Sequence, residues 1–168
     1  MTHTSTAPVT ADVEQDPPPT TVAVDIVLFG ADGDRLRVLT ICRLWPPYEG
    51  RRALPGGLLE EDEDLAAAAV RELGEETGCV AGGPFIPLGA VTQRAGKIVT
   101  AWATEGDCDA DSIRSNTFKM QWPPKSGQWA TFPEVDRAGW FSPEEAMSKL
   151  IPAQADFVTR LQDYLNTH

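Results

Sequence analysis

The sequence predicts a single α/β domain in which a mixed β-sheet is flanked by helices. A chain of 168 residues is the length of one domain with a substantial core. Its hydrophobic fraction of 42% and charged fraction of 23% are ordinary for a globular protein. Strand-like apolar runs precede and follow one strongly helical segment at residues 66–76, which is the pattern of an α/β domain.

The first 20 residues are predicted to form a disordered tail before the domain at residues 21–168. The tail is rich in Pro and Thr and has no apolar periodicity. It also lacks the basic residues and the apolar run of a signal peptide, so we expect a cytoplasmic protein. No later apolar run reaches the roughly 18 residues that a membrane span requires.

A hairpin and a helix are predicted in the first half of the domain. Residues 22–29 form an apolar run typical of a strand buried on both faces. Residues 30–33 have turn composition, and 36–41 are predicted to be the returning strand. A loop follows at 45–52. Residues 66–76 have strong helix propensity, and Gly78 stands where a C-terminal cap is expected.

The second half of the domain alternates strands with a long loop and ends in helices. Strands are predicted at 85–91 and 97–104, and a segment rich in Trp and Pro, residues 105–135, is predicted to be irregular. The sequence then predicts a short strand at 140–141. Ser142 is the expected N-cap of a helix with Glu145 as its capping-box partner. A last amphipathic helix is predicted at 153–164.

Composition excludes several classes of function. The net charge of −11 disfavours binding to long nucleic acids and to anionic membranes. The two histidines, His3 and His168, lie at the chain ends, which disfavours histidine-based nucleophile systems and zinc sites. Cys42, Cys79 and Cys108 are far apart in the sequence, so we expect three reduced thiols. Acid–base or metal chemistry must then depend on carboxylates.

Carboxylates are concentrated between residues 60 and 76, which hold seven of the eleven net negative charges. Glu72, Glu75 and Glu76 fall on one face of the predicted helix, where like charges repel each other. They are either a solvated acidic surface or ligands of a cation. Oxygen ligands without His or Cys suit Mg²⁺ or Mn²⁺, and the glycines at 56–57 would let backbone approach a ligand closely.

The spacing Gly57-x5-Glu63-x7-Arg71-Glu72-Leu73-x-Glu75-Glu76-x-Gly78-Cys79 resembles the Nudix box, with all seven fixed residues present. The departure is Cys79, where a larger apolar residue is usual. The preceding hairpin, the Ala-Leu-Pro-Gly-Gly stretch at 53–57 and the helix start at 140–145 are also similar to Nudix hydrolases. The resemblance implies an α/β/α sandwich around a mixed sheet.

The resemblance also implies roles for individual residues. Glu72, Glu75 and Glu76 would bind divalent cations, Mg²⁺ or Mn²⁺, together with the carbonyl of Gly56. Arg71 would orient these glutamates through a salt bridge, and Glu63 would brace the loop against the helix. The resemblance therefore implies five catalytic residues in the box: Glu63, Arg71, Glu72, Glu75 and Glu76.

The implied reaction is hydrolysis of a nucleoside diphosphate linked to another moiety. An ADP-ribose-like nucleotide sugar, a dinucleotide or a nucleoside triphosphate would fit, and ADP-ribose is favoured because the amino-terminal half is most similar to that branch. A catalytically silent nucleotide sensor or interaction module is the alternative, disfavoured because every box carboxylate is intact. A calcium-binding module lacks the loop spacing of an EF-hand. The family resemblance is also compatible with a homodimer.

Candidates outside the box come from loops. The resemblance implies an additional catalytic or metal-binding glutamate in the loop before Trp140, where Glu134 is preferred to Asp136, with an ordinary loop charge as the alternative and Glu105 as the reserve. Loop aromatics either stack on a nucleobase or pack under the loops; they are Trp45, Tyr48, Phe118, Trp122 and Trp129.

Polar residues beside the predicted strands complete the candidates. Gln93, Arg94 and Lys97 would contact phosphate or sugar, or lie on an ordinary surface. Trp45, Arg94 and Trp122 are the selected substrate-binding candidates. Asp25, inside an apolar strand, is either a buried hydrogen-bonded acid or part of a pocket.

Overall fold

The computed structural model describes residues 21–45 and 49–168, so the predicted tail lies outside the described residues. In this part of the chain seven strands form one sheet. They are β1 Val22–Asp32, β2 Arg35–Arg43, β3 Arg52–Ala53, β4 Gly56–Leu58, β5 Phe85–Thr92, β6 Ile98–Glu105 and β9 Val135–Phe141. The strand order is β3-β2-β1-β6-β5, with β4 paired to β1 and β9 paired to β2.

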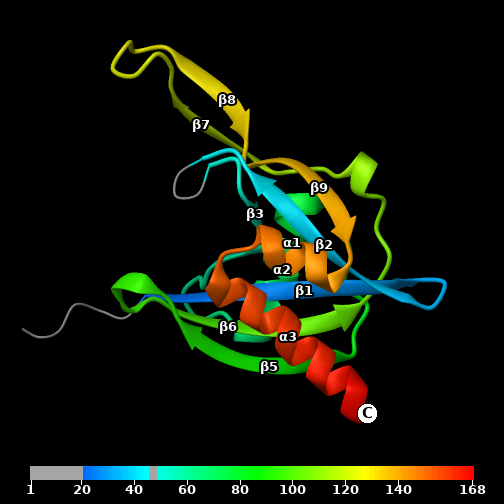
Figure 1. The fold of residues 1–168 in the computed structure, drawn as a ribbon. Coiled ribbons are helices and arrows are strands. Elements are labelled where there is room, and N and C mark those ends of the chain that lie inside the picture. The colour runs from blue at the N-terminus through cyan, green and yellow to red at the C-terminus, as the bar shows by residue number, and fades with distance from the viewer. Residues whose placement is uncertain (1–20, 46–48) are drawn as a thin grey trace, which may run out of the picture.

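Helices cover both faces of this sheet (Figure 1). α1 (Leu65–Thr77) lies on one face, and α2 (Pro143–Lys149) and α3 (Pro152–Thr167) lie on the other. The β1–β6 pairing is parallel and the other pairings are antiparallel. The sheet is therefore mixed, and the predicted α/β/α sandwich is confirmed. Among the described helices, none has the length and apolar character needed to cross a membrane.

The central strand β1 explains the two halves of the core. Val24, Ile26 and Leu28 pack beneath α1, together with its Leu73. Alternate β1 residues such as Val27 face the other way and pack against α2 and α3. Because helices cover both faces, every position in the middle of β1 favours an apolar side chain. The apolar run in the sequence, interrupted at Asp25, is the consequence.

The predicted caps at Gly78 and Ser142 are confirmed, and Asp64 is a further cap that was not predicted from the sequence. At the start of α1 the Asp64 side chain accepts a hydrogen bond from the backbone N–H of Ala67. At its end Gly78 adopts a left-handed conformation with φ of 74°, as glycine readily does. The Ser142 hydroxyl accepts from the Glu145 N–H at the start of α2. Both boundaries are confirmed to within two residues.

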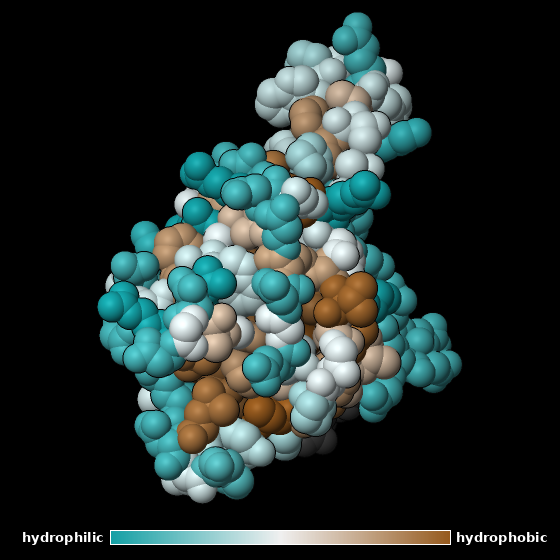
Figure 2. All heavy atoms as spheres, turned by 90° about the vertical axis from the view of Figure 1, so that its right-hand side faces the viewer, coloured by the Kyte–Doolittle hydropathy of each residue, from teal (hydrophilic) through white to brown (hydrophobic). Residues whose placement is uncertain are grey.

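The segment at 105–135 differs from the prediction of an irregular loop. It contains one short 3₁₀ helix, Ala110–Ser112, and a hairpin formed by β7 (Thr117–Gln121) and β8 (Trp129–Pro133). Another 3₁₀ helix, Arg94–Gly96, lies before β6. This hairpin projects from the body of the molecule, as Figures 1 and 2 both show. It has no fully buried face, so its sequence lacks the apolar alternation that identifies a strand.

The last strand is longer than predicted. β9 begins at Val135 rather than at residue 140, and a register shift occurs where it pairs with Cys42 and Arg43 of β2. Before Trp140 it contains Asp136, Arg137 and Gly139 rather than an apolar run. Pairing with β2 rather than local propensity therefore determines where this strand starts.

The cysteines also differ from the prediction of three reduced thiols. Cys79 and Cys108 form a disulfide, whereas Cys42 is free and buried. The two bonded residues are 29 positions apart in the sequence, and their Cα atoms are 5.7 Å apart. The fold places the loop after α1 beside the loop after β6, a proximity that sequence spacing does not reveal.

Candidate functional site

A cavity of about 830 Å³ opens between α1, the strands β1 to β4 and the start of α3. Most of the residues selected from the sequence line it: Trp45, Gly56, Arg71, Glu72, Glu75, Glu76, Arg94 and Glu134. Lys97 and Gln93 line it as well. Glu63 lies behind Arg71 rather than in the wall, and Trp122 is not part of the lining in the described structure.

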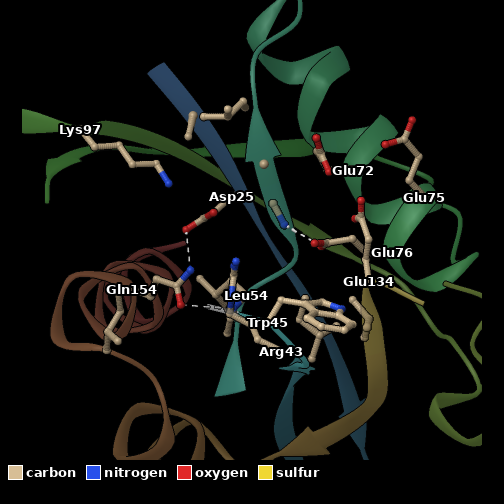
Figure 3. Close-up of a pocket in the computed structure, with 18 of the residues that line it drawn as sticks. Asp25, Arg43, Trp45, Leu54, Glu72, Glu75, Glu76, Lys97, Glu134 and Gln154 are labelled. Atoms are coloured by element: carbon tan, nitrogen blue, oxygen red, sulfur yellow. Dashed lines mark hydrogen bonds between the residues drawn. The ribbon is translucent and has the colours of Figure 1, made fainter. Parts of the chain in front are cut away.

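Glutamates of α1 form one end of the cavity, shown on the right of Figure 3. The helix packs on the sheet through Ala69 and Leu73, which turns the side chains of Glu72 and Glu76 towards β4. Glu76 is only 6% exposed, and the backbone N–H of Gly56 donates to its Oε2 over 2.9 Å. The like-charged glutamates that the sequence places on one helix face therefore form a wall of the cavity.

Arg71 binds three of the box glutamates at once. Its Nε donates to Glu63 Oε1 over 2.7 Å, and its Nη2 donates to Glu63 Oε2 over 3.0 Å. Its Nη1 donates to Glu72 Oε1 and to Glu75 Oε2, each over 3.0 Å. These bonds raise the pKa of Arg71 above its usual range and lower the pKa of the Glu63 carboxyl. The arginine therefore stays charged and fixes the glutamates around it.

Two adjacent glycines let β4 pass between carboxylates. A Cβ atom on Gly57 would collide with the carboxylate of Glu72. A Cβ on Gly56 would collide with the Asp25 carboxylate and with the carbonyl oxygen of Val24. Successive residues of a strand face opposite sides, so these two glycines admit different carboxylates on the two sides of β4 (Figure 3).

The electrostatics at the glutamate end favour an added cation. Burial raises the pKa of Glu72 and raises that of Glu76 strongly, and the neighbouring Glu134 adds to both effects. A bound cation would reverse these shifts by stabilising the charged carboxylates. In residues 21–45 and 49–168 no three acidic, His or Cys side chains are already arranged as a metal cage. The donor set nevertheless fits Mg²⁺ or Mn²⁺, because it consists of oxygen ligands alone.

Glu134 reaches the same end of the cavity from the far side. It follows β8, and Figure 3 shows its side chain directed towards Glu72 and Glu76. Asn116 links it to α1: with its amide nitrogen facing Glu134, Asn116 donates to Glu134 Oε2 over 3.0 Å and to the Glu75 carbonyl over 3.2 Å. The reserve candidates lie elsewhere. Asp136 is beside Arg137, and Glu105 borders a separate small hollow.

Aromatic side chains cluster where the β7–β8 hairpin meets the cavity. Trp45 contacts Phe118 and Phe132 edge to face, and its Nε1 donates to the Pro133 carbonyl over 3.1 Å. Trp45 and Phe118 also line the cavity. Trp122 packs against Phe132 and is 51% exposed. These rings thus form a small core of their own, of which one side faces the cavity.

Two aromatic candidates from the sequence take no part in this cluster. Tyr48 lies outside the described residues. Trp129 is 66% exposed on the β7–β8 hairpin and is not part of the cavity lining in the described structure.

The opposite end of the cavity contains a polar pair that sequence reasoning did not assemble. Gln154 of α3 donates from Nε2 to Asp25 Oδ2 over 3.0 Å and accepts at Oε1 from the Leu54 N–H over 3.4 Å. Burial raises the pKa of Asp25 to about 7, against the lowering effect of Gln154 and of Lys97. Asp25 carried a signal in the sequence, an acid inside an apolar strand, whereas Gln154 carried none.

Comparison with known proteins identifies the family to which this chain belongs. A family model described as the NUDIX domain matches residues 19–161. The ADPR responsive transcriptional repressor NtrR of Acinetobacter baylyi is 40% identical to this chain over 67 residues. That match covers 39% of the chain and 27% of the repressor, so the chain spans about a quarter of the length of this curated relative.

Solved structures share the fold at low sequence identity. The NUDIX domain of Shewanella oneidensis NrtR, solved in complex with ADP ribose, is 20% identical with a TM-score of 0.68, and the match covers 90% of this chain and 94% of that one. A Caenorhabditis elegans (C. elegans) Ap4A hydrolase binary complex is 16% identical with a TM-score of 0.63, covering 87% and 99%. At these identities the likeness is one of fold.

Proposed function

This chain belongs to the Nudix family, and we propose that it is a divalent-metal-dependent hydrolase of a nucleoside diphosphate linked to another moiety. One observation carries the proposal. Glu72 and Glu75, held by Arg71, and Glu76, held by the Gly56 N–H, line the same nucleotide-sized cavity as the glycines of β4. A cavity of about 830 Å³ is within the range of small-molecule sites.

Glu72, Glu75, Glu76 and the Gly56 carbonyl would hold the metal in this proposal. When bound, Mg²⁺ or Mn²⁺ supplies charge neutralisation for the diphosphate and a more acidic water molecule. The protein contributes orientation. Arg71 holds Glu72 and Glu75 from behind, and the Gly56 N–H fixes the carboxylate of Glu76. Glutamates held before the substrate arrives need no reorganisation during the reaction.

Glu134 is the residue we assign to proton transfer. It comes from a different element than the box and faces the glutamates across the cavity. Asn116 holds one of its carboxylate oxygens and so fixes the direction of the side chain. A general base must lie within reach of the attacking water, and a carboxylate that lines the cavity beside Glu72 and Glu76 is placed to meet that requirement.

ADP-ribose is the substrate we place first. Support comes from the Acinetobacter baylyi repressor, which is described as ADPR-responsive, and from the Shewanella oneidensis domain bound to ADP ribose. The same relatives favour a second function, a nucleotide sensor without catalysis. The intact box favours the hydrolase, because a sensor has no need of four positioned carboxylates.

The test is a metal-dependent turnover assay with a panel of ADP-ribose, dinucleotides and nucleoside triphosphates. We expect cleavage of at least one compound with Mg²⁺ or Mn²⁺ and none after chelation. Hydrolysis of ADP-ribose would release AMP and ribose 5-phosphate. Glu76→Gln should lower kcat by at least ~10², because it removes charge from a metal ligand. The matched control Glu144→Gln, an exposed glutamate of α2, should retain wild-type rates.

Two results would decide against hydrolysis. One is a folded wild-type protein that binds ADP-ribose in calorimetry yet cleaves nothing in the panel with any metal, which would support the sensor. The other is a Glu76→Gln variant with wild-type rates, which would place the catalytic site elsewhere.

A further inference from the structure

The inner end of the cavity holds a buried pair of polar side chains between apolar residues on one side and the cations Lys97 and Arg43 on the other. Its walls include Ile41, Leu54 and Ile151, and Asp25 and Gln154 meet among them. Asp25 is 6% exposed and Gln154 is 8% exposed. Burying polar side chains opposes folding unless their hydrogen bonds are satisfied, so such a pair calls for an explanation beyond stability.

The Gln154 amide is fixed in one orientation. Its oxygen accepts from the Leu54 N–H, so its nitrogen must face Asp25. An amide nitrogen carries two hydrogens, and only one of them is used in the bond to Asp25. Within the described parts of the chain, the second hydrogen has no hydrogen-bond acceptor. The pair therefore presents an N–H donor beside a carboxyl acceptor in the wall of the cavity.

The chemistry of this end differs from that of a phosphate site. A carboxylate at its centre repels phosphate oxygens, even though Lys97 extends towards Asp25 and Arg43 lies close by (Figure 3). A ligand group that satisfies Asp25 and Gln154 must offer a donor next to an acceptor. A nucleobase edge does so, and its flat faces suit a cavity that also has apolar lining residues such as Leu54 and Ile151.

We propose that Asp25 and Gln154 form a nucleobase subsite, which selects the substrate by hydrogen bonding to the edge of its base. The inference rests on the proposed function, since it places the base at one end of the cavity and the diphosphate at the glutamates. Gly56 joins the two ends, because its N–H bonds Glu76 while its Cα lies against the Asp25 carboxylate. A substrate spanning both would cross β4 at that residue.

Steady-state kinetics on a matched pair of substrates tests the subsite. The pair consists of the best nucleoside diphosphate compound from the turnover panel and an analogue in which the base is replaced by hydrogen. The variants are Asp25→Asn and Gln154→Leu. The controls are Asp32→Asn, an exposed residue of the same strand, and Gln162→Leu on the same helix.

We expect both subsite variants to raise KM for the base-containing compound at least ~10-fold while kcat changes less than ~3-fold, since the site loses only base contacts. The values of kcat/KM for the base-free analogue should match wild type within ~3-fold. Asp25→Asn should also change the relative kcat/KM for two different bases, because an amide offers a donor where the carboxylate accepts. The controls should be unchanged.

Three results separate the outcomes. If wild type is active but the variants affect both compounds equally, the subsite is wrong and the hydrolase stands. If wild type cleaves nothing, the hydrolase is wrong. Calorimetry then measures the affinities of wild type and the variants for ADP-ribose and its base-free analogue. A loss of affinity for ADP-ribose alone supports the subsite, and an equal loss for both compounds overturns it. If Asp25→Asn does not fold, Gln154→Leu alone must show the base-dependent loss, and an equal loss for both compounds overturns the proposal.

Discussion

The two ends of the cavity are built on different physical principles. At one end, carboxylates from a single helix are held by a charged arginine, and each glutamate lies within five positions of Arg71. At the other end, Asp25 is held by a neutral amide from Gln154, 129 positions away in the sequence. The first arrangement concentrates charge that a cation can balance. The second offers directional hydrogen bonds in an apolar surrounding, which suits recognition rather than chemistry.

The strand β4 connects these ends and keeps them apart. Gly56 lies against the Asp25 carboxylate, whereas Gly57 lies against the carboxylate of Glu72. Neither position has room for a Cβ atom. A change at Gly57 should therefore act on the glutamate end alone, whereas a change at Gly56 disturbs Asp25 and, through the Gly56 N–H, also Glu76.

The largest effect is expected at the glutamate end. Glu72→Gln should lower kcat about 10²–10³-fold with little change in KM, because the side chain would bind the metal rather than the base. Melting temperature should stay close to wild type, since the cost of burying the Glu72 charge offsets its salt bridge with Arg71. Initial rates over a range of substrate and Mg²⁺ concentrations check this. A variant in which KM alone changes would remove the distinction between the two ends.

Loss of the disulfide is expected to affect stability more than either function. Cys108→Ser opens a loop closed over 29 positions and should lower the free energy of unfolding by about 2–4 kcal/mol. Urea unfolding measures it, with Cys42→Ala as the matched control for a cysteine outside the bond. Thiol titration of the denatured, unreduced wild type should find one reactive thiol. Three would contradict the pairing.

The two glycines should separate stability from activity. Gly56→Ala meets the Val24 carbonyl, which is backbone and cannot move aside, so we expect about 1–3 kcal/mol of destabilisation. Gly57→Ala meets the end of the Glu72 side chain, which can rotate away. It should therefore lower kcat about 10-fold with a smaller loss of stability. Equal stability losses in the two variants would show that β4 does not divide the cavity in this way.

The smallest expected effect is on the pH dependence of stability. Because the pKa of Asp25 is about 7 in the folded protein and 3.8 is its ordinary value, the folded state binds more protons between these values. Stability should thus be highest at the acidic end of this window and decrease as pH rises through about 7. Asp25→Asn should reduce the decrease by a few degrees in metal-free melting curves. An identical pH profile would indicate that Asp25 is not buried.

The sequence identified the glutamate end because the information there is local. Arg71, Glu72, Glu75 and Glu76 lie on consecutive turns of one helix, so spacing alone predicts that they share a face. Glu134 was added from the family resemblance, and the structure brings it to the same cavity.

The rest depends on packing between distant segments. Gln154 meets Asp25 only because α3 crosses the sheet above β1. Cys79 meets Cys108 only because two loops end side by side. The β7–β8 hairpin was missed for a related reason: without a fully buried face, its strands have no apolar alternation for a pattern to detect.

The central claim is that one end of the cavity performs the chemistry and the other selects the substrate. The most direct measurement is a parallel determination of kcat and KM for wild type, Glu76→Gln and Asp25→Asn with the best substrate of the panel. We predict a kcat at least ~10²-fold lower with nearly unchanged KM for Glu76→Gln, and a KM at least ~10-fold higher with nearly unchanged kcat for Asp25→Asn. If both variants change the same parameter, or if wild type binds without forming product, the claim is contradicted.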